Sequence, residues 1–359
     1  MEDQLFSPLE ELPFGEVLTA LLDEDQVLDP LNLYRLSDLS PGNLMDVQMI
    51  WPRISLERRR ALVEDLEDLT DTNPLLSFES IFRLALKDED QQVRFFAIRA
   101  IEIFDTDDLI PHFISVLKEE ESVDLRAVTA SVLGKYVYRG ELDKISKKLK
   151  KEIEDNLLEI LKKDHPPEIQ RRALEAVSYS SREEVRDHIL KAYQSELDEW
   201  MASSLFAMGR SFDHQYSDLV LEKLHHTSPK VRLEAVRACG ELILEDAVPI
   251  IIDLLHDLPD IRGSAIWALS QIGGEDAGPA IHRLLDDEVS SDEEDLIQQA
   301  LERLDFLDEG INMSMFDLPY TDDEIILDDY DYQQDDYDDY DEDDIGLENF
   351  DIDDDLWLE

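Results

Sequence analysis

The chain has 359 residues, with 33 Lys and Arg against 88 Asp and Glu, and a formal net charge of −55. A surface this acidic repels phosphates, so we expect neither a nucleic-acid partner nor an anionic membrane surface. The only thiol, Cys239, excludes a disulfide framework and a Cys-ligated zinc site, and no apolar run approaches the roughly 20 residues that cross a bilayer. These features predict a cytoplasmic protein.

Charge divides the chain into three parts, because no Lys or Arg precedes Arg35 or follows Arg303. We expect an acidic N-terminal segment over 1–42, a folded body over 43–306 and an acidic tail over 307–359. Residues 14–22 are predicted to form a helix that caps the first repeat, since the end repeats of an array need a polar outer face.

An internal repeat is the strongest signal in the body. Its best copies read VRFFAIRAIEIF, VRLEAVRACGELI and IRGSAIWALSQIGG and begin at Val93, Val231 and Ile261; weaker copies begin at Leu125, Ile169 and Trp200. In the best copies an aliphatic residue is followed by Arg, then by Ala four and seven residues after the aliphatic one. This spacing predicts an amphipathic helix whose small central residues let a neighbouring helix approach closely.

A second predicted helix carries Asp, then Pro three residues later, then Leu six residues after the Pro. The three clear copies are DLIPHFISVLKE, DAVPIIIDLLHD and DAGPAIHRLLDD, which begin at Asp108, Asp246 and Asp276. Asp can cap a helix, and Pro is tolerated in the first turn. The period of about thirty residues therefore predicts antiparallel helix pairs that stack on one another to bury their apolar faces.

These segments resemble HEAT repeats, in particular the short subtype of the phycobilin-lyase-like HEAT proteins, whose second helix reads roughly V-R-x-x-A-x-x-A-L-G. The resemblance implies an all-α, right-handed solenoid over 43–306, and such solenoids serve mostly as binding platforms. Deoxyhypusine hydroxylase, an enzyme of this fold, would bring His-Glu metal ligands, yet none of the eight histidines here precedes Glu. We expect no catalytic residues, no metal and no cofactor.

One repeat spacing is 44 residues, because a Lys-rich segment interrupts the period. Its bases extend the first helix of that repeat or project from its edge. They form either a solvated helix with ion pairs or a patch for an acidic partner or the chain's own tail. The candidate partner-binding residues in this segment are Lys144, Lys147, Lys148, Lys150 and Lys151.

Two further residue types in the repeats have alternative roles. The repeated arginines Arg94, Arg126, Arg232 and Arg262 either hold adjacent turns together, as with Asp90 near Arg94 or Asp260 beside Arg262, or face a tetrapyrrole in a lyase-like protein. Trp200 and Trp267 should pack in the core or between repeats, although a tryptophan on the concave surface would be a good binding anchor.

The acidic tail includes DDYDYQQDDYDDYDEDD, which packs like charges too closely to fold alone and is predicted to be disordered. It is either a solvated tail or a docking segment for a basic groove. Its candidate partner-binding residues are Tyr330, Tyr332, Tyr337, Tyr340, Phe350 and Trp357. The sequence as a whole favours a non-enzymatic scaffold or adaptor with a basic protein partner, and a lyase-like protein acting on a tetrapyrrole or another small ligand is the alternative.

Overall fold

The computed structural model describes residues 13–24, 27–104, 106–286 and 289–316, and within these ranges all regular structure is helical. The predicted N-terminal helix is confirmed as α2 (Phe14–Leu22), and α3 (Pro30–Tyr34) follows it. The helices up to residue 312 belong to one compact unit. Within the described ranges, no helix is long and apolar enough to cross a membrane.

The remaining helices form antiparallel pairs, as the repeat predicted. The first helices of the pairs are α4 (Pro41–Ile50), α6 (Glu79–Ala85), α8 (Ile110–Glu119), α10 (Lys147–Lys162), α12 (Glu183–Tyr193), α14 (Ser217–Lys223), α16 (Val248–Leu254) and α18 (Ala277–His282). The second helices are α5 (Leu56–Thr72), α7 (Gln91–Ala100), α9 (Val123–Glu141), α11 (Pro167–Val177), α13 (Asp198–Arg210), α15 (Pro229–Glu241), α17 (Pro259–Ile272) and α19 (Ser291–Phe316).

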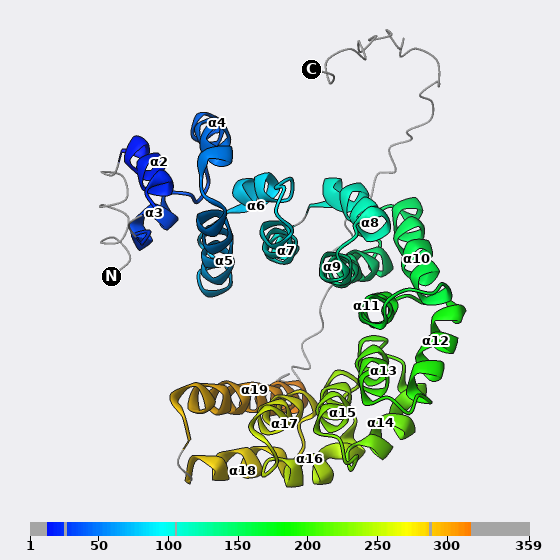
Figure 1. Ribbon diagram of the computed structural model, residues 1–359. Coiled ribbons are helices and arrows are strands. Elements are labelled where there is room, and N and C mark those ends of the chain that lie inside the picture. Colours follow the sequence, from blue (N-terminus) through cyan, green and yellow to red (C-terminus); the bar gives the residue numbers. More distant parts are fainter. Residues whose placement is uncertain (1–12, 25–26, 105, 287–288, 317–359) are drawn as a thin grey trace, which may run out of the picture. The chain divides into compact units, whose positions relative to one another are not determined.

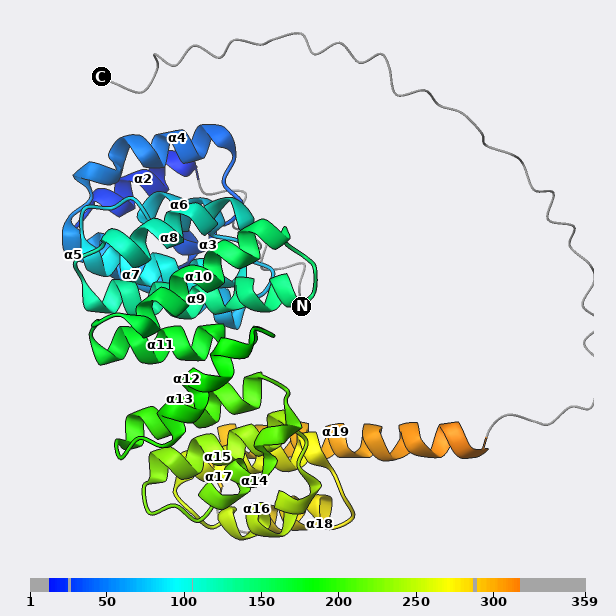
Figure 2. The same ribbon diagram turned by 90° about the vertical axis from the view of Figure 1, so that its right-hand side faces the viewer.

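The two helices of a pair occupy different layers. From α5 to α17 the second helices pack side by side in succession, and we call this row the inner layer. The first helices lie along its outer side and touch one another much less (Figures 1 and 2). One continuous apolar core runs between the layers from Val17 to Leu304. The predicted all-α solenoid of stacked helix pairs is therefore confirmed.

Close approach within the inner layer depends on a glycine that faces an alanine of the next second helix. A Cβ added at Gly134, Gly209 or Gly240 would lie 3.0 Å from the Cα of Ala176, Ala238 or Ala268 respectively. Each of these alanines is the second Ala of the repeat motif. The small residues thus have the predicted role, because a larger side chain at either position would force neighbouring helices apart.

The aspartates expected to cap the first helices do not do so. Asp108 and Asp246 lie in short 3₁₀ turns that precede α8 and α16, and Asp276 makes no side-chain cap hydrogen bond to α18. Asp108 instead accepts hydrogen bonds of 2.6 and 2.9 Å from Arg83. The 3₁₀ turn moves the start of the α-helix beyond the reach of the carboxylate, while Pro still occupies the first turn of α8 and α16.

The repeated arginines hold successive repeats together. Arg232 donates two hydrogen bonds, of 2.8 and 2.9 Å, to Asp257, and two more to backbone carbonyls of the preceding turn. Arg94 pairs with Glu120 at 2.8 Å, and Arg262 donates to Glu293 at 2.9 Å. The structural role is confirmed, but the carboxylates lie 25 to 31 residues further along the chain.

The carboxylates named from the sequence are therefore wrong partners. Asp90 pairs with Arg60 rather than with Arg94, and Arg262 reaches Glu293 rather than Asp260. The fourth arginine, Arg126, has different partners, since it donates to the carbonyl of Leu117 and contacts His165 Nδ1. Asp260 is two positions from Arg262 on the same helix, so its side chain points in another direction. The Asp90 carboxylate is instead taken by Arg60 and by the first amides of α7.

Replacing Asp90 with Asn should lower the free energy of unfolding by about 1–2 kcal/mol at pH 7. The hydrogen bond from Arg60 lowers the pKa of Asp90 from 3.8 to about 2. A lowered folded pKa stabilises the fold above pH 3.8 and loses that effect as the pH falls towards 2. Urea unfolding at pH 7, 4 and 2.5 should show wild type and variant converging. A constant difference at all three pH values would contradict this account, since Asn keeps the ability to cap α7.

The Lys-rich insertion lengthens two neighbouring helices. The first of them, α9, has 19 residues, and α10, which is the first helix of its pair, has 16. α10 packs against both α9 and α11. The segment therefore extends a first helix, which was one of the two predicted arrangements. The expectation that the disordered tail starts at residue 307 is wrong, because residues 307–316 form the end of α19. The rest of the predicted tail, 317–359, with all six of its candidate residues, lies outside the described residues.

Candidate functional site

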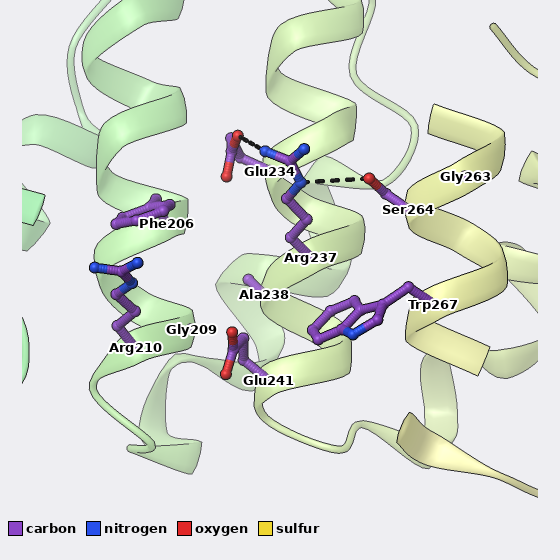
Figure 3. Close-up of a pocket in the computed structure, with 10 residues that line it drawn as sticks. All are labelled: Phe206, Gly209, Arg210, Glu234, Arg237, Ala238, Glu241, Gly263, Ser264 and Trp267. Carbon is purple, nitrogen blue, oxygen red and sulfur yellow. Dashed lines mark hydrogen bonds and ion pairs between the residues drawn. The ribbon is translucent and has the colours of Figure 1, made fainter. Parts of the chain in front are cut away.

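A groove of about 380 Å³ opens on the inner layer across α13, α15 and α17, and we call it the inner groove (Figure 3). Its wall combines apolar, acidic and basic side chains from three consecutive second helices. The lining residues are Phe206, Gly209, Arg210, Glu234, Arg237, Ala238, Glu241, Gly263, Ser264 and Trp267.

Trp267 forms one wall of the inner groove. Its ring extends from α17 towards Ala238 and Glu241 of α15 (Figure 3). Gly240 makes room for the indole, because a Cβ at that position would lie only 2.5 Å from Trp267 Cζ3. Trp267 is half-buried, so it packs between repeats and also presents part of its ring to the groove. It thus fits both roles considered from the sequence, including that of an anchor.

Trp200 is also half-buried, but it lies elsewhere. It lines a separate pocket together with His188 and Lys191 of α12 and residues of α10 and α11. Trp200 is the first residue of its repeat copy, whereas Trp267 lies six residues after Ile261, so the two rings have different surroundings. This difference makes Trp200 a suitable control for Trp267.

The charged residues Arg237 and Glu234 lie in the groove wall formed by α15. Arg237 links α15 to α17, because its Nη1 donates to Glu234 Oε1 at 2.9 Å and its Nε donates to Ser264 Oγ at 3.3 Å. Burial raises the pKa of Glu234, and Arg237 only partly opposes that effect. Glu234 Oε2 is buried and has no hydrogen-bond partner among the described residues. A buried carboxylate oxygen without a donor is costly, which makes this wall receptive to a donor.

Arg210 lies against aromatic rings on the opposite wall. Its guanidinium carbon is 4.2 Å from the Phe206 ring centroid and 5.3 Å from that of Tyr179. Tyr179 in turn contacts Tyr138 and Phe212, with ring centroids 4.9 and 6.5 Å apart. Aromatic residues and arginine are the types that dominate the energy of protein interfaces.

An apolar rim lies at the C-terminal ends of the second helices, and Arg210 of the groove contacts its member Tyr179. We define it as Tyr138, Tyr179, Phe212 and Ile243. Tyr138 is 41% exposed, Phe212 55% and Ile243 57%. These residues lie at the ends of α9, α11, α13 and α15, so the rim follows four successive repeats.

Two rim residues have a backbone conformation that normally favours glycine. The φ angles of Phe212 and Ile243 are 53° and 51°, and at the related position after α17 the residue is Gly273 with φ 77°. Near Ile243 the amide of Leu244 donates to the carbonyl of Cys239 at 3.0 Å, which is the bond of a Schellman helix end. A bulky residue costs about 1–3 kcal/mol in this conformation. Phe212 and Ile243 therefore keep exposed apolar side chains at strained helix ends.

Replacing Ile243 with Gly should therefore raise the free energy of unfolding by up to about 1 kcal/mol, even though it removes an aliphatic side chain. The strain that Gly relieves exceeds the flexibility that it adds to the unfolded chain. Urea unfolding monitored by circular dichroism measures the change. A loss of more than 1 kcal/mol would instead assign Ile243 to the support of the fold.

The predicted lysine patch lies away from the inner groove. Lys144, Lys147, Lys148 and Lys151 are exposed, and Lys151 pairs with Asp155 of the same helix at 2.6 Å. Lys150 is half-buried and pairs with Glu141 at 2.7 Å. Part of this segment is thus an ion-paired helix. Its role in partner binding stays a prediction.

Other candidate chemistry has a structural explanation. Cys239 is fully buried, and burial raises the pKa of its thiol to about 12, so it packs as a small apolar residue. The four arginines that a tetrapyrrole-binding role would use are engaged in the contacts described above. Among the described residues, no group of three or more His, Cys, Asp or Glu side chains is arranged to hold a metal ion.

Comparison with known proteins identifies the repeat. Residues 217–302, which include α14 to α18 and the first part of α19, match the family model described as HEAT repeats. Residues 217–302 of this chain carry HEAT repeats. The resemblance seen in the sequence is thereby confirmed. No curated protein sequence matches the chain.

Several solved HEAT-repeat and related structures are similar at low identity. The phycocyanin lyase complex of CpcE and CpcF from Nostoc sp. PCC7120 is 17% identical, covering 63% of this chain and 94% of that one, with a TM-score of 0.44. Yeast importin-beta is 13% identical, covering 82% and 47%, with a TM-score of 0.45. Human deoxyhypusine hydroxylase is 15% identical, covering 83% and 97%, with a TM-score of 0.35.

Sequence reasoning missed most of the inner groove and the rim. It singled out Trp267, but not Arg210, Phe212, Glu241 or Ile243. A signal was present, because superposing the HEAT motifs places Phe212 and Ile243 close to the glycine that ends the Ile261 copy. A bulky residue where a helix end favours glycine is a feature that the periodicity of apolar residues does not reveal.

Proposed function

We propose that this chain is a non-enzymatic protein-binding scaffold that docks a basic protein partner on its inner layer. The observation that carries the proposal is the apolar rim, where Phe212 and Ile243 are more than half exposed in a strained backbone conformation. Exposed apolar side chains that border a pocket are typical of interaction sites. The cytoplasm is the proposed location.

Charge supports a basic partner. The sequence has 55 more acidic than basic residues, and the segment after Arg303 contains no base at all. Such an excess attracts cationic proteins over long distances and raises their rate of association. In this proposal the rim supplies the short-range apolar contact, while the general acidity steers the partner towards the scaffold. The six tail residues are proposed as secondary contacts of this partner, and the candidate lysines as a site for the chain's own acidic tail.

The test is affinity capture from a lysate of the source organism with two full-length double variants. One variant carries Phe212→Ser and Ile243→Ser in the rim. The control carries Leu197→Ser and Leu258→Ser, which remove exposed leucines, 59% and 52% exposed, at the N-terminal ends of α13 and α17. Both variants lose two exposed apolar side chains, so they separate the rim from general hydrophobicity.

We expect a basic protein that wild type and the control retain at low salt and that the rim variant loses. Mass spectrometry identifies the retained proteins, and moderate salt should weaken their capture because the steering is electrostatic. Equal capture by the rim variant and the control would refute a role for the rim. Capture of acidic proteins alone would refute the basic partner.

A further inference from the structure

The wall between α15 and α17 offers an aromatic face beside an unpaired carboxylate. Figure 3 shows the Trp267 ring directed towards Glu241. Within the described ranges, no hydrogen bond or ion pair involves the Glu241 carboxylate, and no acceptor contacts Trp267 Nε1. An aromatic ring next to a free carboxylate is the arrangement that recognises organic cations.

A second carboxylate strengthens this arrangement. Glu234 lies two helical turns before Glu241 on α15, and its buried Oε2 has no partner among the described residues. Arg237 contacts only the other oxygen of that carboxylate, Oε1. Because Oε2 lies in the groove wall without a donor, a ligand that brings N–H groups would satisfy it after a small side-chain rotation.

We propose that the inner groove binds a cationic side chain, Lys or Arg, of the partner protein, stacked on Trp267 and paired with Glu241. This inference rests on the proposed function, because it names the chemical group by which the basic partner would be recognised. The rim would then contact the apolar residues that flank that side chain. The groove volume of about 380 Å³ accommodates the side chain together with part of its backbone.

A cation fits the groove better than an anion for two reasons. The two arginines of the groove are already engaged, since Arg237 pairs with Glu234 and Arg210 lies against Phe206 and Tyr179. In addition, a net charge of −55 repels an approaching anion and attracts a cation. Glu241 is therefore the charged group of the groove that is most available to a ligand.

The experiment follows the indole N–H signals of the full-length protein by NMR, with the Trp267 signal assigned from its loss in Trp267→Phe. The probe is Nα-acetyl-arginine amide, and Nα-acetyl-lysine amide tests the other cation. Nα-acetyl-citrulline amide is the neutral counterpart of the arginine probe, and Nα-acetyl-glutamate amide is the acidic one. We expect a saturable shift of the Trp267 signal with the two cationic probes only.

Two charge-neutralising variants test the carboxylate. Glu241→Gln should weaken binding of the arginine probe at least about five-fold, because a charge-assisted pair is lost. Asp253→Asn removes the same charge from an exposed position on α16 in the outer layer and should leave binding unchanged. The Glu241 carboxylate forms no hydrogen bond or ion pair within the described ranges, and Gln has nearly the same shape, so the variant should unfold at the same urea concentration as wild type.

The outcomes separate this inference from the proposed function. Equal shifts with the citrulline probe, a shift with the acidic probe alone, or unchanged binding in Glu241→Gln would each overturn the cation site. If the rim variant nevertheless loses its partner, the scaffold function stands without this site. If the cationic probes bind as expected but the rim variant keeps every partner, the cation site stands and the rim has no role.

Discussion

Replacing Trp267 with Ala is expected to weaken binding of the basic partner at least about 30-fold, which corresponds to about 2 kcal/mol. The indole forms the wall of the inner groove between α15 and α17, and it is the largest aromatic side chain among the lining residues. Alanine would remove both the stacking face and the Nε1 donor. Titration of the captured partner by calorimetry measures the change.

Trp200→Ala is the matched control for this loss. It removes the same side chain from a half-buried position on α13, in a pocket outside the inner groove. Partner affinity should then stay within about three-fold of wild type, because residues outside an interaction hot spot contribute little. Urea unfolding of both variants shows how much of any loss reflects stability. Equal losses of affinity at matched stability would contradict the assignment of Trp267 as the anchor.

Replacing Gly240 with Ala should lower the free energy of unfolding by up to about 2 kcal/mol, although Ala favours helices. The added Cβ would lie 2.5 Å from Trp267 Cζ3 and 3.0 Å from Ala268 Cα, so both the indole and α17 must move. Overpacking of this kind costs about 1–3 kcal/mol, which outweighs the gain in helix propensity of about 1 kcal/mol. Urea unfolding measures the stability, and tryptophan fluorescence reports the displaced ring.

Gly42→Ala gives the opposite sign and serves as the control. Gly42 lies in α4, and a Cβ there would meet no atom within 4 Å. The substitution should therefore stabilise the protein by up to about 1 kcal/mol through helix propensity alone. The chemical change is the same at both sites, so a difference in stability between the two variants reflects the neighbouring atoms. Stabilisation by Gly240→Ala would show that α15 and α17 separate without cost.

Local patterns in the sequence were sufficient to predict the fold. The spacing of Val231, Ala235 and Ala238 identifies an amphipathic helix with a small face, and its recurrence about every thirty residues identifies stacked pairs. These properties depend on the 3.6-residue period of a helix and on the volume of single side chains, and both can be read from neighbouring residues. The repeated arginines were also recognised as structural for this reason.

The partners of those residues were harder to predict. Arg94 and Arg262 pair with Glu120 and Glu293 of the following repeat, whereas the sequence suggested carboxylates nearby in the chain. Likewise, Asp108 was expected to cap a helix, but a 3₁₀ turn directs it to Arg83. Such contacts depend on the offset between stacked pairs and on the first turn of each helix, which local periodicity leaves open.

The sequence by itself determined an acidic, all-helical repeat array, because charge, periodicity and side-chain size are properties of the residues and their spacing. Only the tertiary structure decided where a site could form. It brought Glu241 of α15 to the ring of Trp267 of α17 and placed Phe212 and Ile243 on one rim. Those relations arise from how closely Gly240 lets two helices approach and from the backbone conformation at helix ends, which are set by packing between repeats.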